Sequence, residues 1–258
     1  MRQILFFFSG IFSWDYENFN DWPESCQNGK AQSPINIDSK TVIKFSDKHD
    51  DLNASDIYPA GLVREATVTT QHLQLHFTFE QPVVIKGHLC PQIHFHFNQS
   101  EHTFDRLHSF GESHLVCHSD DYDSFDAANA SGELNAVHVF SVLIESGSEK
   151  DNADFQQVID AKELSKAEIP ITKPTNTCTV IRYQGSLTTP NCDEPVTWSI
   201  FKEKTSISEN QVDQILAWND GTVNNNRPVQ NLNNREIYEY SNAELFNVGV
   251  LVLAVLCL

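Results

Sequence analysis

The hexapeptide QIHFHF (residues 92–97) places two histidines one residue apart inside an aromatic run that is typical of a β-strand. Side chains at positions i and i+2 share one face of a strand, so His94 and His96 point together, whereas Phe95 and Phe97 point to the opposite face. Two imidazoles are too few to hold a catalytic metal ion. The pattern therefore predicts a third ligand on a neighbouring strand.

The segment GESHLVCHSD (111–120) supplies a third imidazole. His114 lies in an alternating run and so has a defined strand face. If this run pairs antiparallel with residues 92–97, His114 converges with His94 and His96 on one point. Three neutral imidazoles and a water molecule form a catalytic zinc site, because the fourth position stays open. Zn²⁺ is therefore the cofactor that this pattern predicts.

Two polar residues accompany these histidines. Gln92 precedes His94 by two positions and can accept a proton from its ring, and Glu112 precedes His114 by the same step. Such hydrogen-bond partners fix the tautomer and orientation of zinc-bound imidazoles. An isolated His-x-His pair is more often a solvent-facing or satisfied polar group, and these partners favour the metal interpretation.

The 258 residues are enough for one large domain, and short alternating segments dominate the middle of the chain. The pattern predicts an α+β fold, a single domain around a large, twisted, mostly antiparallel central β-sheet with a few peripheral helices. The formal net charge of −18 disfavours nucleic acid as a partner. Strands are expected over 66–79, 82–87, 92–97, 113–118 and 134–146, and helices over 152–164 and 206–218, the second capped by Ser206 or Ser208.

The two ends of the chain differ from the rest. Residues 1–13 carry an early Arg2 and an apolar run, which predicts a secretory signal peptide. Residues 241–258 are largely apolar but too short to span a membrane, which favours a cleaved GPI-anchor signal over a final buried strand. The domain proper is then expected over 14–240, at the extracellular face of the plasma membrane or secreted.

Sequons and cysteines fit that location. Asn-x-Ser sequons occur at Asn53, Asn98 and Asn129, and six cysteines are present. Cys257 falls in the expected anchor signal. Among Cys90, Cys117 and Cys178 at most one pair can form, and the sequence does not select it.

Several sequence blocks together resemble the α-class carbonic anhydrases, specifically their extracellular, GPI-anchored members. The blocks stand in the order of that family and extend from residue 14 to about residue 238. They are QSPINI (32–37), QIHFHF (92–97), SEHT (100–103), ESHLV (112–116), YQGSLTTP (183–190), TW (197–198) and NNRPVQ (225–230).

The resemblance implies a role for individual residues. His94, His96 and His114 match the zinc ligands, and Thr188 matches a threonine that orients zinc-bound hydroxide by donating to an acid, here Glu101. Cys26 and Cys192 match a disulfide of extracellular members. The apolar substrate pocket is implied to consist of Val116, Val137, Leu187, Thr189 and Trp198.

The resemblance departs from the family pattern at the proton shuttle. An ungapped alignment of residues 69–75 places Gln71 at the shuttle position, and His72 reaches it only with a one-residue deletion. A shift of one residue turns a strand side chain to the other face. His72 is accordingly carried as the candidate shuttle, with an exposed strand histidine as the alternative.

The implied reaction is reversible hydration of CO2 to bicarbonate and a proton, by attack of zinc-bound hydroxide on CO2 in an apolar pocket. The partners are then the small molecules CO2 and bicarbonate, and the membrane through a lipid anchor. A rival hypothesis is an inactive binding module on the same fold. The complete histidine triad, together with Glu101 and Thr188, argues against it.

Overall fold

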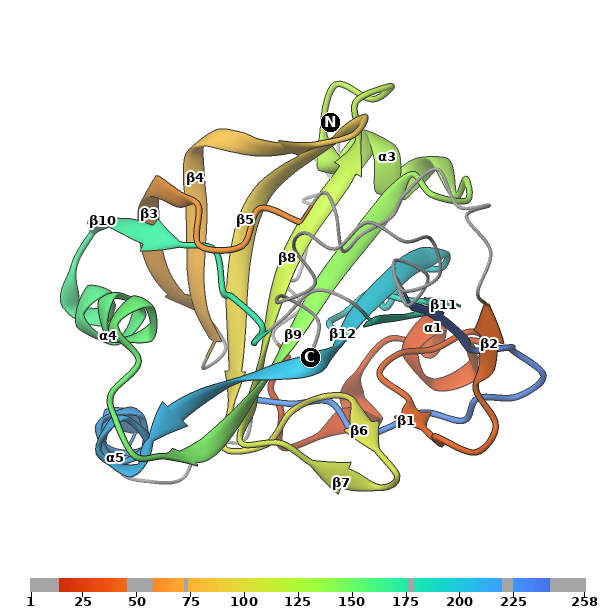
Figure 1. The fold of residues 1–258 in the computed structure, drawn as a ribbon. Helices are drawn as coiled ribbons and strands as arrows, with labels where there is room; N and C mark the ends of the chain where they lie inside the picture. Colours follow the sequence, from red (N-terminus) through yellow and green to blue (C-terminus); the bar gives the residue numbers. More distant parts are fainter. Residues whose placement is uncertain (1–13, 46–57, 72–73, 176–178, 220–224, 242–258) are drawn as a thin grey trace, which may run out of the picture.

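The computed structural model describes residues 14–45, 58–71, 74–175, 179–219 and 225–241 (Figure 1). Several predictions fall outside these residues and stay predictions: the signal peptide over 1–13, nearly all of the anchor signal over 241–258, the shuttle candidate His72, the sequon residue Asn53, and Cys178.

Strands make up most of the described chain, and the helices are short. The strands are β1 (Asn36–Ile37), β2 (Ile43–Phe45), β3 (Val63–Gln71), β4 (Gln74–Ile85), β5 (His88–Phe97), β6 (Thr103–Phe104), β7 (Leu107–His108), β8 (Gly111–Ser119), β9 (Val137–Ser148), β10 (Lys166–Pro170), β11 (Thr179–Gly185), β12 (Val196–Ser208) and β13 (Tyr238–Ser241). The helices are α1 (Glu24–Asn28), α3 (Phe125–Ser131), α4 (Ala153–Asp160) and α5 (Glu209–Leu216), with short 3-10 turns η1 (Phe19–Asp21), η2 (Ala161–Glu163) and η3 (Ala217–Asn219).

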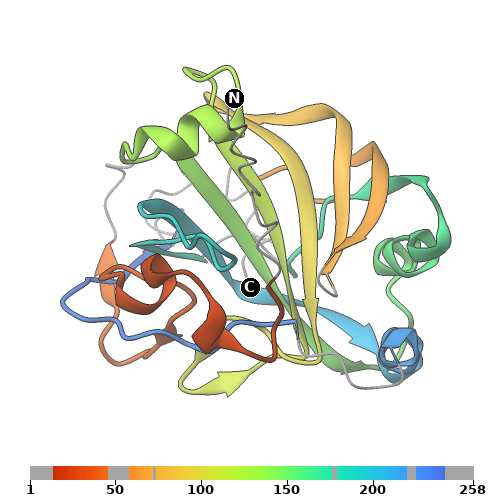
Figure 2. The same ribbon diagram turned by 180° about the vertical axis from the view of Figure 1, so that it is seen from behind.

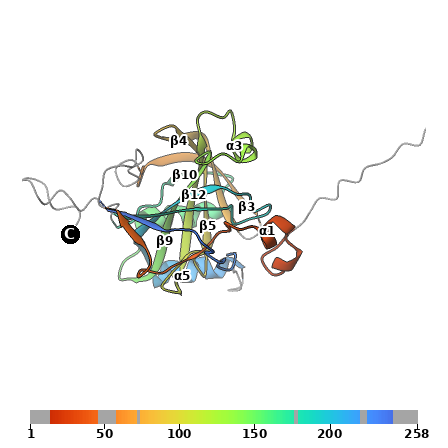
Figure 3. The same cartoon turned by 90° about the vertical axis from the view of Figure 1, so that its right-hand side faces the viewer.

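In the described residues a ten-stranded sheet has the order β10-β3-β4-β5-β8-β9-β12-β11-β13-β2, and β1, β6 and β7 form a separate three-stranded sheet. Neighbouring strands of the ten-stranded sheet are antiparallel except β9 with β12 and β13 with β2. The views from front and back show α4 and α5 together at one end of the sheet (Figures 1 and 2). In the side view β2 and β13 lie next to each other although they come from opposite ends of the chain (Figure 3). The predicted fold class is confirmed.

The structure corrects one predicted strand and confirms the second predicted helix. The alternating run 66–79 is not one strand: β3 ends at Gln71, β4 begins at Gln74, and Thr70 pairs with Leu75 across the resulting hairpin. The apolar positions change parity near residue 72, and that change marks the hairpin. The second predicted helix is α5, and its cap is Ser208, whose hydroxyl accepts the Gln211 N–H.

The sheet has two apolar faces, and alternation decides which side chain joins which. Phe95, Leu115 and Phe140 pack on the face covered by α4 and α5. Val116 and Trp198, from the other parity of their strands, pack in the second core. His94, His96 and His114 have the second parity, so they lie on the face of the sheet opposite α4 and α5.

Two disulfides form in the described chain. Cys26 bonds to Cys192, as the resemblance implied, and closes a separation of 166 residues. In the chain-entropy model such a loop contributes about 4–5 kcal/mol. Cys90 bonds to Cys117 and joins β5 to β8, which settles the pairing that the sequence left open.

His138 on β9 is a buried core histidine. Its Nε2 lies 2.8 Å from the Ser199 hydroxyl, whereas Nδ1 has no hydrogen-bond partner in the described part of the chain. Burial, and secondarily the charge of His88, lowers the pKa of His138 to about 3. The imidazole is therefore neutral in the folded protein, although it is protonated below about pH 6.5 once unfolded.

This histidine predicts a pH-dependent loss of stability. Between pH 6.5 and about 3 the unfolded state binds a proton at His138 that the folded state does not, so the free energy of unfolding falls as pH decreases. Replacing His138→Leu is expected to reduce that slope by up to about 1.4 kcal/mol per pH unit in urea unfolding. Ser199→Ala, which keeps the imidazole, should retain the slope. An equal slope in wild type and His138→Leu would contradict the assignment.

Candidate metal centre

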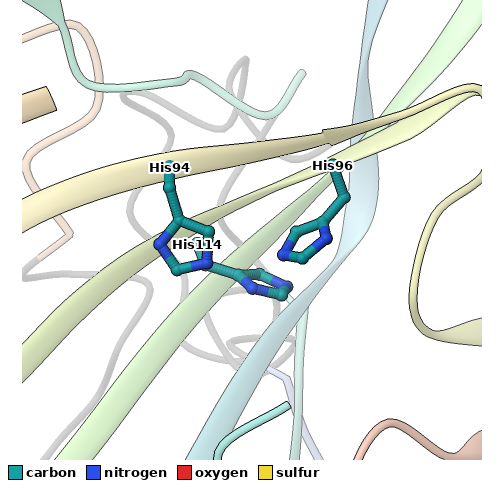
Figure 4. Close-up of side chains that lie close together, drawn as sticks. All are labelled: His94, His96 and His114. Carbon is teal, nitrogen blue, oxygen red and sulfur yellow. The ribbon is translucent and has the colours of Figure 1, made fainter. Parts of the chain in front are cut away.

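The three predicted histidines converge (Figure 4). His94 and His96 extend from β5 and His114 from β8, and His94 stands directly opposite His114 in the antiparallel register. One ring nitrogen of each lies within 4.8 Å of the corresponding nitrogen of the other two. All three side chains are buried. The pairing proposed from the two sequence segments is the one that the fold contains.

A second hydrogen bond orients each ring. His94 Nδ1 lies 3.0 Å from Gln92 Oε1, and His114 Nε2 lies 2.9 Å from Glu112 Oε1. His96 Nδ1 lies 2.5 Å from the backbone oxygen of Asn225. These contacts leave Nε2 of His94 and His96 and Nδ1 of His114 to face a common ion. The first two partners were predicted, and Asn225 was missed because a backbone carbonyl leaves no signal in a local motif.

Glu112 is held by more groups than the sequence suggested. Its Oε2 accepts the backbone N–H of His102, and its Oε1 lies 2.7 Å from His102 Nδ1 and 2.5 Å from the Ser141 hydroxyl that donates to it. Burial alone would raise the pKa of this carboxyl. His102 and His114 outweigh it and hold the Glu112 pKa well below its usual range. The carboxylate is thus ionised and accepts the His114 proton.

Burial also keeps the three ligands neutral. It is the largest influence on the pKa of each, and it lowers the pKa of His94, His96 and His114. The neighbouring imidazole of His76 lowers the His94 pKa further. Neutral imidazoles are the form that binds metal.

Glu101 is completely buried beside the triad. Its Oε1 accepts the Arg227 backbone N–H at 2.8 Å, and its Oε2 lies 3.5 Å from His96 Nε2 and 3.9 Å from His114 Nδ1. No described residue gives Oε2 a hydrogen bond of ordinary geometry. Burial raises the pKa of Glu101 well above its usual range, although the Arg227 N–H and the Thr188 hydroxyl, which both stabilise the carboxylate, lower it in part. The Thr188 hydroxyl therefore lies close to the Glu101 carboxyl group.

The loop after β11 brings Thr188 to the site. Gly185 allows a close approach there, because a Cβ at this position would lie 2.1 Å from the Ser33 hydroxyl. The Leu187 N–H donates to Asp193 O, and the Cys192 N–H donates to Thr189 O. The loop is therefore closed on itself, and the Cys26–Cys192 disulfide ties it to the N-terminal segment.

A cavity of about 130 Å³ opens beside the histidines. Its wall contains Val116, Leu187, Thr188, Thr189 and Trp198, all named from the sequence. The expectation for Val137 is wrong. Val139 lines the cavity instead, because it pairs with Val116 across β8 and β9, whereas Val137 pairs with His118 further along.

Two polar residues of the cavity wall, Gln74 and His76 on β4, were not identified from the sequence. The His76 ring stacks on His94 with centroids 4.9 Å apart, and its Nε2 lies 2.9 Å from Gln74 Oε1. Gln74 Nε2 in turn lies 3.2 Å from His96 Nε2. The signal was available, since both residues alternate with the apolar Leu75 and Phe77, but it required the hairpin to be recognised first.

Two of the predicted sequon residues lie in the described chain. Asn98 is exposed and adopts a positive φ of 71° directly after β5. Asn129 lies in α3, partly exposed, and its amide donates to Asp193 Oδ2 at 2.8 Å. Modification at either asparagine stays a prediction.

The donor set fits zinc. Three neutral imidazole nitrogens with oriented rings and an open cavity side match a catalytic zinc site rather than a closed structural one. Oε2 of Glu101, buried and without a hydrogen-bond partner of good geometry among the described residues, lies near two of these nitrogens, where a bound cation would stabilise the carboxylate.

Comparisons with known proteins agree with this class of site. The family model of the eukaryotic-type carbonic anhydrases matches residues 14–241. A solved α-carbonic anhydrase of Thermovibrio ammonificans, in complex with the inhibitor sulfanilamide, aligns with a TM-score of 0.61 at 26% identity, over 83% of this chain and 89% of that one. The fold and the histidine site thus define an enzyme of the α-carbonic anhydrase class, which uses zinc.

Curated relatives give the same answer. Putative carbonic anhydrase 3 of Caenorhabditis elegans is 31% identical over 239 residues, 84% of this chain and 92% of that protein. A carbonic anhydrase of Dunaliella salina is 29% identical over 270 residues, 93% of this chain but 45% of that protein, so the chain spans less than half of that relative. The chain belongs to the eukaryotic-type carbonic anhydrase family.

The ligand assignment predicts the metal content of variants. His94→Ala is expected to reduce bound zinc from about one ion per chain to near zero, because two imidazoles do not complete the site. His118→Ala is the matched control: His118 belongs to the same strand as His114, but it is not in the ligand cluster, and its Nδ1 contacts Ser119 O. Elemental analysis of dialysed protein measures both. Full zinc occupancy in His94→Ala would refute the assignment.

Proposed function

We propose that this protein catalyses the reversible hydration of CO2 to bicarbonate and a proton. Membership of the carbonic anhydrase family supports this activity. The observation that carries the proposal is the joint presence of three convergent imidazoles, an adjacent threonine near a buried acid, and an apolar cavity wall. An inactive binding module would not need all three.

His94, His96 and His114 would hold the zinc ion. Bound zinc acts as a Lewis acid and lowers the pKa of water to near 7, as is established for carbonic anhydrases. The chain contributes the neutrality of the imidazoles, which burial maintains, and their fixed orientation, which Gln92, Glu112 and Asn225 provide.

Thr188 and Glu101 orient the attacking oxygen. A hydroxyl has one proton and two lone pairs, so a Thr188 that donates to the Glu101 carboxylate can only accept from the nucleophile. Arg227 keeps Glu101 in place through its backbone N–H. The nucleophile then presents a lone pair, rather than its proton, to the substrate carbon.

The apolar wall suits the substrate. Val116, Val139, Leu187 and Trp198 line the cavity together with His94 and His114, and the Trp198 Nε1–H donates to Ser186 O outside the cavity. CO2 is apolar, and the apolar part of the wall offers it a surface that does not hydrogen-bond to water. The product proton must leave, and His72 remains the proposed shuttle.

Removal of the metal tests the activity. Protein stripped of zinc with a chelator should lose stopped-flow CO2 hydration and regain it on addition of one equivalent of zinc, since no other group supplies the nucleophile. A fully zinc-loaded protein without hydration activity would favour the inactive binding module. Undiminished hydration by metal-free protein would refute the proposal.

Thr188→Ala should separate metal binding from chemistry. Loss of the orienting hydroxyl is expected to lower kcat/KM for CO2 about 100-fold while zinc content stays unchanged. Thr41→Ala, at an exposed turn where the hydroxyl donates to Asp38 O, should leave both unchanged. A Thr188→Ala enzyme with wild-type kcat/KM would remove this residue from the mechanism.

The proposal includes secretion, N-glycosylation and a lipid anchor at the outer cell surface. The signal-like and anchor-like ends support it, and so do the two disulfides, which favour an oxidising compartment. None of the described helices has the length and hydropathy of a membrane span. Phosphatidylinositol-specific phospholipase C should release the protein from intact cells, and retention after that treatment would contradict the anchor.

A further inference from the structure

The Cys90–Cys117 disulfide lies behind the metal centre. Cys90 is on β5, four residues before His94, and Cys117 is on β8, three residues after His114. Both sulfur-bearing side chains are completely buried in the core on the face opposite the histidines. The bond therefore joins the two strands that carry all three metal ligands, without contacting the cavity.

The strand pairing is irregular at this place. Leu89 pairs with His118 and Gln92 with Val116, so two residues of β5, Cys90 and Pro91, stand opposite a single residue of β8. This is a β-bulge, and Pro91 has no N–H for the ladder. The bulge also shifts the alternation of side chains along β5 by one residue, because Leu89 and Gln92 face the same side of the sheet although three positions separate them.

The other neighbour of β5 does not compensate. The register between β4 and β5 is also interrupted, between the Thr78 and Val83 positions of β4. The ladder is thus irregular on both sides of β5 at Pro91, directly before Gln92, although Cys90 still pairs with Val83 of β4. The covalent bond between Cys90 and Cys117 fixes β5 against β8 where the hydrogen-bond ladder does not.

We propose that the Cys90–Cys117 disulfide is a positioning element of the metal centre: it holds His94 and His96 in place relative to His114, so zinc binds more tightly to the oxidised protein than to the reduced one. The ligands of a pre-organised site need less ordering when the ion binds. Thermodynamic reciprocity then requires zinc to favour the disulfide over the dithiol by the same factor.

The unmodified protein provides the first test. Metal-free and zinc-loaded samples are equilibrated in glutathione redox buffers at fixed free zinc, and the two disulfides are quantified by alkylation and mass spectrometry. We expect zinc to shift the reduction equilibrium of Cys90–Cys117 toward the disulfide at least tenfold, the scale of other orienting contacts around bound metals. A shift below twofold, or an equal shift for Cys26–Cys192, would overturn the proposal.

A variant pair provides the second test. Cys90→Ala/Cys117→Ala should raise the zinc Kd at least tenfold in competition with dipicolinate, and should broaden or shift the visible spectrum of the cobalt-substituted protein. Ile215→Ala removes buried volume in α5, away from the ligands, and should lower stability while changing the Kd less than twofold. A folded double variant with the Kd of wild type would show that the disulfide only stabilises the chain. If the double variant does not fold, the redox equilibrium of the unmodified protein decides whether the proposal holds.

Discussion

The antiparallel register of β5 and β8 is the constraint on which the rest of the site depends. It places His94 directly opposite His114, and the strand period of two residues brings His96 to the same face. A shift of one residue in either strand would turn its imidazoles into the apolar core. The sheet therefore fixes the ligand geometry, and each ring then needs only one additional hydrogen bond to set its rotation.

The buried carboxylates determine the chemical state of the site. Glu112 stays ionised because His102, His114 and the Ser141 hydroxyl compensate for its burial. Glu101 is compensated less, since it has the Arg227 N–H on one oxygen and no partner of good geometry among the described residues on the other. Because burial raises the Glu101 pKa, a cation bound between the three neutral imidazoles would favour the ionised carboxylate, so metal binding and ionisation of Glu101 would support each other.

Prediction of the site from sequence succeeded where contacts follow strand alternation. Gln92, His94 and His96 follow one another in steps of two residues along β5, as do Glu112 and His114 along β8. The pairing of these two strands brings all five together. Prediction was wrong or silent where distant parts meet. The resemblance implied Val137 for the cavity wall, where Val139 lies instead, because the register of β9 against β8 is not visible in either strand alone.

The sequence alone determined the class of this protein: a β-rich domain, three metal-binding histidines, and the order of motifs that relates the chain to the carbonic anhydrases. Local periodicity predicts the strands and the shared face of the histidines, because alternation along a strand is a property of a single segment; the family follows from the resemblance of the motifs. Only the tertiary structure decided that Asn225 orients His96, that His76 lines the cavity and that Cys90 pairs with Cys117. These contacts depend on sheet register, on a bulge and on loop closure, which arise only when segments far apart in the chain pack together.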